Sequence, residues 1–166
     1  MQLLYKNLLC VASFLLCFHF AHSIDILECG SYWTYENVTI ENCSDEDTSC
    51  PLTIGTNTSI SFVLNTGKRN DGLIDISGNI INDVAFYING NMKFALSVTP
   101  DDPCDILKCP LEINYKAVFS AQIFVSPQYP PLSARVKWIM KTEKDDQLMC
   151  FSFPVTLYPE DSKMIA

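Results

Sequence analysis

The sequence contains only 2 histidines, and both lie in the first 23 residues. There, one basic residue precedes an apolar run that ends in the small-x-small cleavage site Ala21-His22-Ser23. This pattern is typical of a secretory signal peptide, and the run is too short to span a membrane. Without histidine, residues 24–166 cannot form a Ser-His-Asp triad, a Cys-His dyad or a zinc site that contains histidine.

Other catalytic patterns are also missing. The chain has no GxSxG elbow, no P-loop and no GxGxxG motif. Paired carboxylates, which can perform acid–base catalysis or bind calcium, occur at 45–47, 101–102 and 145–146. All three clusters fall in predicted turns, where solvated charge is expected. We therefore predict no catalytic residue, no metal site, no cofactor and no enzymatic activity.

Basic residues are few. The chain has 11 Lys and Arg against 19 Asp and Glu, and its net charge is −8. Removing residues 1–23 takes away one basic residue and no acidic one, which leaves about −9. Such a surface repels nucleic acid and anionic membranes, so we expect no nucleic-acid partner.

Six cysteines remain after the signal peptide, and in an exported domain they indicate three disulfides with fifteen conceivable pairings. Spacing favours two small loops, Cys43–Cys50 and Cys104–Cys109, which leaves Cys29 to pair with Cys150 near the chain end. A metal site is the alternative, but the sequence offers no CxxC pair.

Three N-glycosylation sequons agree with export: they begin at Asn37, Asn42 and Asn57. The second carries cysteine in its middle position, which disfavours its use. The sequons predict a secreted, extracellular glycoprotein. No sequence feature selects the lysosomal lumen, which glycans can also lead to, over plain secretion.

Hydrophobic periodicity predicts an all-β fold. Apolar residues occupy alternate positions over 113–125, 132–140 and 149–157, as expected for strands with one buried face. Weaker strand signals lie at 35–40, 60–64 and 74–80. Asn89-Gly90 predicts a hairpin between 85–88 and 92–96. Seven or eight antiparallel strands without a repeat or linker indicate one sandwich or barrel domain over residues 24–166.

The inward faces of these strands are unusually aromatic. They carry Phe62, Phe94, Phe119, Trp138, Phe151 and Phe153. Packed against one another, these side chains form an ordinary core. If the two sheets part, the same side chains line an apolar cavity. Periodicity alone does not separate these alternatives.

The chain resembles the ML lipid-recognition family, and within it the Niemann–Pick type C2-like branch and the mite group 2 allergens. The segments that carry the resemblance are Asp25 to Gly30, Cys104-Asp-Ile-Leu-Lys-Cys109-Pro110 with the Tyr115 strand, Tyr129-Pro130, Val136-Lys-Trp138 and Cys150-Phe-x-Phe-Pro-Val155. The resemblance implies the same cysteine pairing and an immunoglobulin-like two-sheet β-sandwich whose sheets part around a lipid. Two departures, the single proline in 94–100 and the Asn89-Gly90 hairpin, leave fatty acids at least as plausible as sterols.

Periodicity and resemblance together define the candidate ligand-binding residues. They are Phe62, Leu64, Phe94, Leu96, Tyr115, Phe119, Ala121, Ile123, Val125, Tyr129, Pro130, Val136, Trp138 and Phe153. We expect a monomeric carrier of a hydrophobic ligand, such as a fatty acid, a sterol or a related lipid signal, that contacts a membrane or a receptor during transfer. The alternatives are an innate-immune lipid sensor that acts with a receptor, and a closed adhesion-type sandwich that binds no ligand.

Overall fold

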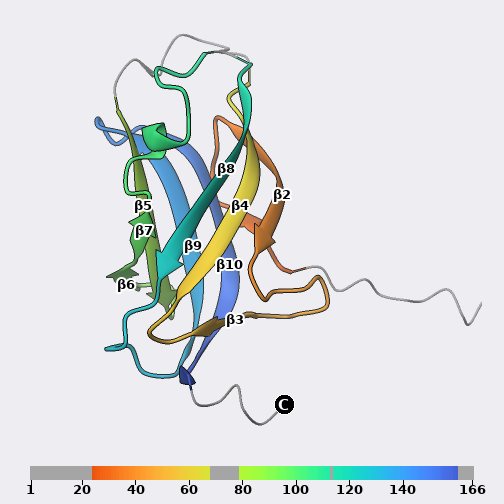
Figure 1. The fold of residues 1–166 in the computed structure, drawn as a ribbon, viewed down its shortest axis with the longest axis vertical. Helices are drawn as coiled ribbons and strands as arrows, with labels where there is room; N and C mark the ends of the chain where they lie inside the picture. Colours follow the sequence, from red (N-terminus) through yellow and green to blue (C-terminus); the bar gives the residue numbers. More distant parts are fainter. Residues whose placement is uncertain (1–23, 68–78, 113, 161–166) are drawn as a thin grey trace, which may run out of the picture.

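The computed structural model describes residues 24–67, 79–112 and 114–160 (Figure 1). Within them, ten strands and one 3-10 turn follow each other along the chain. They are β1 (Leu27–Glu28), β2 (Thr34–Ile40), β3 (Cys50–Thr53), β4 (Asn57–Asn65), β5 (Ile80–Ile88), β6 (Met92–Ala95), β7 (Ser97–Thr99), η1 (Pro103–Asp105), β8 (Lys116–Phe124), β9 (Ser133–Thr142) and β10 (Gln147–Tyr158). No helix in this part of the chain is long and apolar enough to cross a membrane.

The strands form two sheets that face each other (Figure 1). Sheet A has the order β1-β10-β9-β5-β6, with β3 also paired to β10, and sheet B has the order β2-β4-β8-β7. Neighbouring strands are antiparallel, except that β3 runs parallel to β10. The all-β two-sheet sandwich expected from the sequence is confirmed, with this one parallel pair as a difference in detail.

Alternation explains which side chains form the core. On β4 and β8, Phe62 lies opposite Phe119, and on β9 and β10, Trp138 lies opposite Phe151. All four are at most 1 % exposed. Val118, which precedes Phe119 on β8 and lies on the opposite face, is 64 % exposed. The predicted strands 132–140 and 149–157 correspond to β9 and β10, and 60–64 lies within β4.

The predicted hairpin is present, and it is longer than expected on one side. Asn89 and Gly90 both have positive φ, at 50° and 78°, and the Asn91 amide donates to the Ile88 carbonyl at 3.3 Å. Asparagine and glycine tolerate this left-handed backbone better than other residues do. Most of the strand predicted at 74–80, and the first residue of the one predicted at 113–125, lie outside the described residues.

The chain passes from one sheet to the other between β6 and β7. β6 pairs with β5 in sheet A, and β7 pairs with β8 in sheet B, with Leu96 between them. The Leu96 amide donates to the Val84 carbonyl of β5 at 2.8 Å, and its side chain is 8 % exposed. Because β6 and β7 are the last strands of their sheets, the backbone connects the two sheets along this edge.

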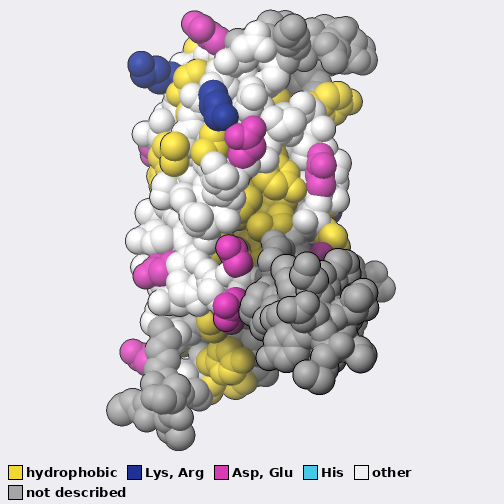
Figure 2. All heavy atoms as spheres, turned by 90° about the vertical axis from the view of Figure 1, so that its right-hand side faces the viewer, with side chains coloured by type: hydrophobic (Ala, Val, Ile, Leu, Met, Phe, Trp, Pro, Cys, Tyr) yellow, Lys and Arg dark blue, Asp and Glu magenta, His cyan; other side chains and the backbone are white. Residues whose placement is uncertain are grey.

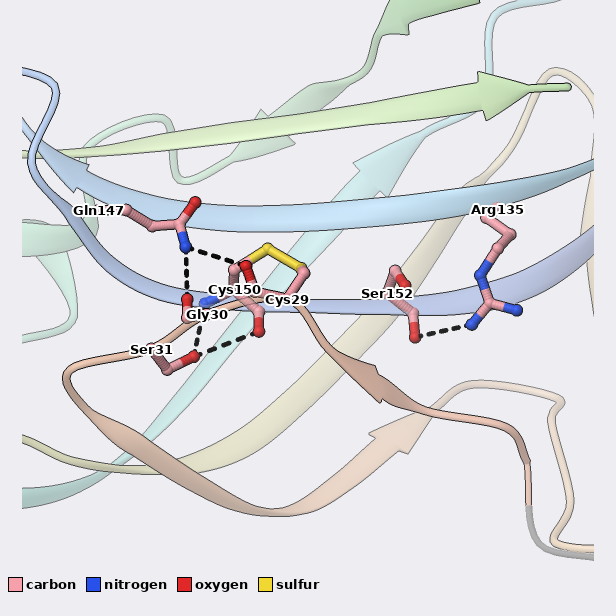
Figure 3. Close-up of a disulfide and its surroundings, with 7 residues drawn as sticks. All are labelled: Cys29, Gly30, Ser31, Arg135, Gln147, Cys150 and Ser152. Carbon is pink, nitrogen blue, oxygen red and sulfur yellow. Dashed lines mark hydrogen bonds between the residues drawn. A yellow bond between two sulfur atoms is a disulfide. The ribbon is translucent and has the colours of Figure 1, made fainter. Parts of the chain in front are cut away.

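Three disulfides join Cys29 to Cys150, Cys43 to Cys50 and Cys104 to Cys109, which is the pairing favoured by spacing. The first of them fixes residues 29–31 against β10 (Figure 3). There the Cys29 amide donates to the Cys150 carbonyl at 3.1 Å, and the Cys150 amide donates to Oγ of Ser31 at 2.9 Å. The Gln147 side-chain amide donates to the carbonyls of Cys29 and Gly30.

Candidate functional site

The interior between the sheets contains a cluster of aromatic side chains. Phe62 of sheet B is central: its ring centroid lies 5.2 Å from that of Phe119, 5.3 Å from Phe151 and 5.9 Å from Trp138. Trp138 and Phe151 stack at 6.3 Å, with an interplanar angle of 7°. Contacts of this kind add to the stability that burial alone provides. The two sheets are therefore in direct contact at this cluster.

A second aromatic group lies at the edge where the chain crosses between the sheets. Tyr129, from the loop after β8, meets Phe86 of β5 at 5.5 Å and Phe94 of β6 at 6.1 Å, both edge to face. Its hydroxyl donates to the Ala95 carbonyl at 3.1 Å. Phe86 is 1 % exposed and Phe94 is 40 % exposed. This group therefore extends from solvent into the core.

Most candidate residues are buried, and four are not. Ten are at most 8 % exposed: Phe62, Leu64, Leu96, Phe119, Ala121, Ile123, Val125, Val136, Trp138 and Phe153. Tyr115 and Tyr129 are half-buried, and Pro130 is exposed. Phe94 was expected to be buried, but it is partly exposed. It lies opposite Phe86, but it sits on the outermost strand of sheet A, where no further strand covers it.

Sequence reasoning missed several side chains of the interior. Tyr35 lies 5.0 Å from Phe151, and burial raises its pKa above the usual range, with a further contribution from the negative charge of Glu28. Phe86, the buried ring of the second aromatic group, belongs to a strand that was predicted only over its second half. Asn82 was missed too, and its Oδ1 accepts a hydrogen bond from the indole nitrogen of Trp138 at 3.2 Å.

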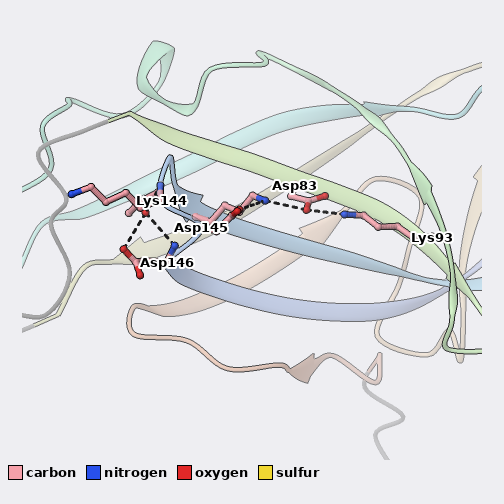
Figure 4. Close-up of polar contacts among 7 residues, drawn as sticks. Asp83, Lys93, Lys144, Asp145 and Asp146 are labelled. Carbon is pink, nitrogen blue, oxygen red and sulfur yellow. Dashed lines mark hydrogen bonds and ion pairs between the residues drawn. The ribbon is translucent and has the colours of Figure 1, made fainter.

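Charged side chains lie outside the interior. The buried polar residues in the described part of the chain are four threonines, and none is ionisable. On the outer face of sheet A, Asp83 contacts Lys93 at 2.8 Å and Lys141 at 3.6 Å, and Asp145 also binds Lys141 (Figure 4). Partial burial raises the pKa of Asp83, but the two lysines outweigh it and hold the pKa below its usual range. The described residues contain no group of three potential metal ligands.

The three sequon asparagines Asn37, Asn42 and Asn57 are all exposed. Asn37 lies in β2 where its pairing with β4 is irregular, Asn42 follows β2, and Asn57 begins β4. Figure 2 shows the side of the molecule that carries β2 and β4, with acidic side chains scattered around a central apolar strip. All three sequons therefore belong to elements on one side of the sandwich.

Fold and interior together define a small, disulfide-bonded β-sandwich with an aromatic interior and no charged group buried in the described residues. The family model described as "ML domain" matches residues 23–157, and the chain belongs to this family of non-enzymatic lipid-binding proteins. This agrees with the prediction that it is not an enzyme. The predicted resemblance to the Niemann–Pick type C2-like branch is confirmed by the relatives that follow.

One similar protein is the Drosophila melanogaster "NPC intracellular cholesterol transporter 2 homolog a". It is 27 % identical over 145 residues, which cover 83 % of this chain and 90 % of the relative. Among solved structures, a Niemann-Pick type C2 protein from the Japanese carpenter ant superposes with a TM-score of 0.66. The identity is 18 %, and the match covers 80 % of this chain and 98 % of the ant protein, a likeness of fold.

Proposed function

We propose that this protein is a secreted carrier that holds a hydrophobic ligand between its two sheets. The ligand is a fatty acid, a sterol or a related lipid. The observation that carries the proposal is an apolar path from the partly exposed Phe94 and Tyr129, through Phe86, to the inner face of β9. There Val136 pairs with Phe86 and lies on the same face as the buried Trp138. Membership of a lipid-binding family and the named cholesterol transporter homologue among its relatives support the same reading.

The proposed ligand space lies alongside β5 and β8. At Phe62 the sheets touch, so the aromatic cluster forms one wall of this space and does not itself hold the ligand. Ala121 and Ile123 of β8 face the interior from sheet B, at 4 % and 0 % exposure. Ala121 has a small side chain, so it fills less of the interior than Phe119 and Ile123, the inward residues on either side of it on β8.

Burial of an acyl chain provides the driving force. Each methylene removed from water contributes about 0.8 kcal/mol, so a chain of about sixteen gives roughly 13 kcal/mol. Association and ordering cost about 4–15 kcal/mol. With a cost near the lower end of this range, about 5 kcal/mol, the remainder is about 8 kcal/mol, which corresponds to a micromolar Kd. A carrier of this kind binds reversibly and makes no covalent product.

We propose that residues 1–23 direct export and that residues 24–166 form the mature domain. The match to the ML domain begins at residue 23, and Ile24 already packs against the core with 9 % exposure, which supports this boundary. Secretion into the extracellular space is the proposed destination. Delivery to a lysosomal lumen through glycans on Asn37, Asn42 or Asn57 is the variant of this proposal that glycan analysis would distinguish.

The test is a ligand titration followed by tryptophan fluorescence. Trp33 is 4 % exposed and would also contribute, so the titration uses a Trp33→Phe background that leaves Trp138 as the reporter. A long-chain fatty acid or a sterol should shift Trp138 emission and saturate at one ligand per chain. Native mass spectrometry of protein purified from its own source should detect a bound lipid of matching class.

A pair of substitutions on one strand separates a ligand space from a filled core. Ala121→Phe adds bulk to the inner face of β8, and Val118→Phe adds similar bulk to its outer face. We expect Ala121→Phe to abolish binding without unfolding the protein, and Val118→Phe to change neither property. In a filled core, the added ring would cost about 1–3 kcal/mol or more. Loss of stability in Ala121→Phe, with no lipid response from Trp138, would leave a closed sandwich and refute the carrier.

A further inference from the structure

The amide of Asn82 lies on the inner face of sheet A among apolar neighbours. Asn82 of β5 is opposite Met140 of β9, which is fully buried. The neighbouring inward residues of β5, Ile80 and Val84, are each 3 % exposed. Because side chains alternate along a strand, the amide of Asn82 belongs to the interior, and its neighbour Asp83 belongs to the charged outer face.

The orientation of this amide is set by Trp138. An indole N–H can only donate, so the atom of Asn82 that faces it must be the oxygen. The Nδ2 group is then directed away from the indole. It is buried, and no acceptor among the described residues is within hydrogen-bonding distance of it.

Buried donors without a partner are rare in proteins, and each calls for an explanation. One other buried side-chain nitrogen in the described residues lacks an acceptor, Nε of Arg135. That guanidinium is bound through its other nitrogens, to Asp25 and to the Ser152 carbonyl. Asn82 differs, because its free donor lies on the apolar inner face beside the ligand space proposed above.

We propose that Asn82 Nδ2 is the polar recognition point of the interior and donates a hydrogen bond to a neutral oxygen of the ligand. The inference rests on the proposed carrier function and narrows its ligand class. The favoured ligands are alcohols, sterols, esters, ketones or aldehydes. An ionised carboxylate is disfavoured, because moving a charge into an apolar interior without a cationic partner is costly.

The alternation of β9 explains why no cation is available. Arg135, Lys137 and Lys141 occupy the positions between the inward residues and therefore lie on the outer face of sheet A. Lys137 packs over the Tyr87 ring at 5.7 Å, and Lys141 is paired with carboxylates. No charged side chain of the described residues is buried. An amide donor is thus the strongest polar contact that this inner face offers.

The position of Asn82 also fixes how a ligand would lie. Phe86, at the aromatic edge with Tyr129, is four residues further along β5. Since a strand rises about 3.3 Å per residue, the two are about 13 Å apart. Val84, which pairs with Trp138, lies between them on the same face. A ligand with its oxygen at Asn82 would extend its apolar body past Trp138 toward Phe86 and Tyr129.

The test compares three ligands of equal chain length: 1-dodecanol, dodecane and dodecanoate. Their affinities are measured by displacement of the apolar dye N-phenyl-1-naphthylamine, so that the readout does not depend on Trp138. Asn82→Leu replaces the amide by an apolar group of similar size. We expect this substitution to weaken the binding of 1-dodecanol about tenfold, the equivalent of one hydrogen bond. The binding of dodecane should be unchanged or slightly tighter.

Two further variants serve as controls for the role of the Asn82 amide. Asn82→Asp keeps an oxygen for the Trp138 indole, and burial is expected to raise the pKa of its carboxyl. The variant is therefore measured across a range of pH: the preference for the alcohol should persist while the carboxyl is protonated and be lost as it ionises, because the carboxylate has no proton to donate. Asn79→Leu removes an exposed amide just before β5 and should change no affinity. Circular dichroism and disulfide mapping verify that each variant is folded.

The outcomes distinguish this inference from the carrier proposal. If the wild-type protein binds all three ligands and Asn82→Leu weakens the alcohol and the alkane equally, the inference is overturned and the carrier stands. Tighter binding of dodecanoate than of 1-dodecanol at neutral pH would also overturn it. If the wild-type protein binds neither the three ligands nor the dye, both the carrier proposal and this inference are refuted.

Discussion

Removing the Cys29–Cys150 disulfide should be the most destabilising loss of a single covalent link. This bridge closes a loop with a sequence separation of 121, against 5 for Cys104–Cys109. By the chain-entropy relation, a loop of that length contributes about 5 kcal/mol at 25 °C, and the small loop contributes about 2 kcal/mol. The difference of about 3 kcal/mol comes from the unfolded chain, so it should appear although the native hydrogen bonds around Ser31 remain.

The assay is urea unfolding of two matched variants, Cys29→Ala/Cys150→Ala and Cys104→Ala/Cys109→Ala. Both replace two sulfurs by hydrogen, so the difference in unfolding free energy isolates the loop length. A typical domain has a total stability of about 5–15 kcal/mol, so the first variant is expected to be marginally folded and the second clearly folded. The dependence of the unfolding free energy on urea concentration must also be compared. A chain without the long-range disulfide exposes more surface on unfolding, so its slope is steeper.

Equal midpoints for the two variants, or a lower midpoint for the small-loop variant, would refute this reasoning. Either result would mean that residual structure already restrains the unfolded chain between residues 29 and 150, or that the small loop fixes η1 and the segment after it. A variant with Ser31→Ala alone separates these contributions. It removes the side-chain bond to the Cys150 amide and leaves the disulfide in place.

Three further predictions concern other parts of the molecule. Phe62→Ala should cost about 3–5 kcal/mol in thermal or urea unfolding, whereas Phe94→Ala, at a 40 % exposed position, should cost clearly less; equal costs would contradict the burial of the two rings. Because the pKa of Asp83 is lowered in the folded protein, its stabilisation is present above about pH 4 and is lost as the pH falls through the folded pKa. Asp83→Asn should therefore flatten the acid side of a stability profile between about pH 5 and pH 2, and an unchanged slope would show that its lysine contacts do not matter. Replacing the carboxylates of residues 45–47 by amides should leave ligand affinity within a few-fold, and loss of binding would reveal a calcium or polar site there.

Strands with one face buried and one face in water could be predicted well from the sequence. The alternation around Phe119, Trp138 and Phe151 placed these side chains on inner faces, where they are fully buried. The alternation in β5 is interrupted by Asn82 and Asp83, so the strand was predicted only from residue 85 onward. These two polar residues have separate tertiary reasons, an indole partner inside and two lysines outside, and neither can be read from local pattern.

Strand order accounts for the other differences. Phe94 has the inward parity of its partner Phe86, but whether an inward residue is covered depends on the neighbouring strands. β6 is the last strand of sheet A, so Phe94 is partly exposed. The parallel pairing of Cys50–Thr53 with β10 joins segments about a hundred residues apart and leaves no periodic signal. Which of the candidate residues contact a ligand stays a prediction until the titrations are done.

The three disulfides also determine how far the sandwich can yield. The cysteines that lie in strands, Cys50 of β3 and Cys150 of β10, both belong to sheet A, and their partners lie in the connecting segments. The third bridge is confined to the loop around η1. No disulfide therefore joins a strand of one sheet directly to a strand of the other. The covalent links between the sheets are connecting segments, such as Leu96 between β6 and β7. For the carrier proposed above, this means that the disulfides stabilise the fold without fixing the separation of the two sheets, so the same set of bridges is compatible with ligands of different width, from a single acyl chain to a fused ring.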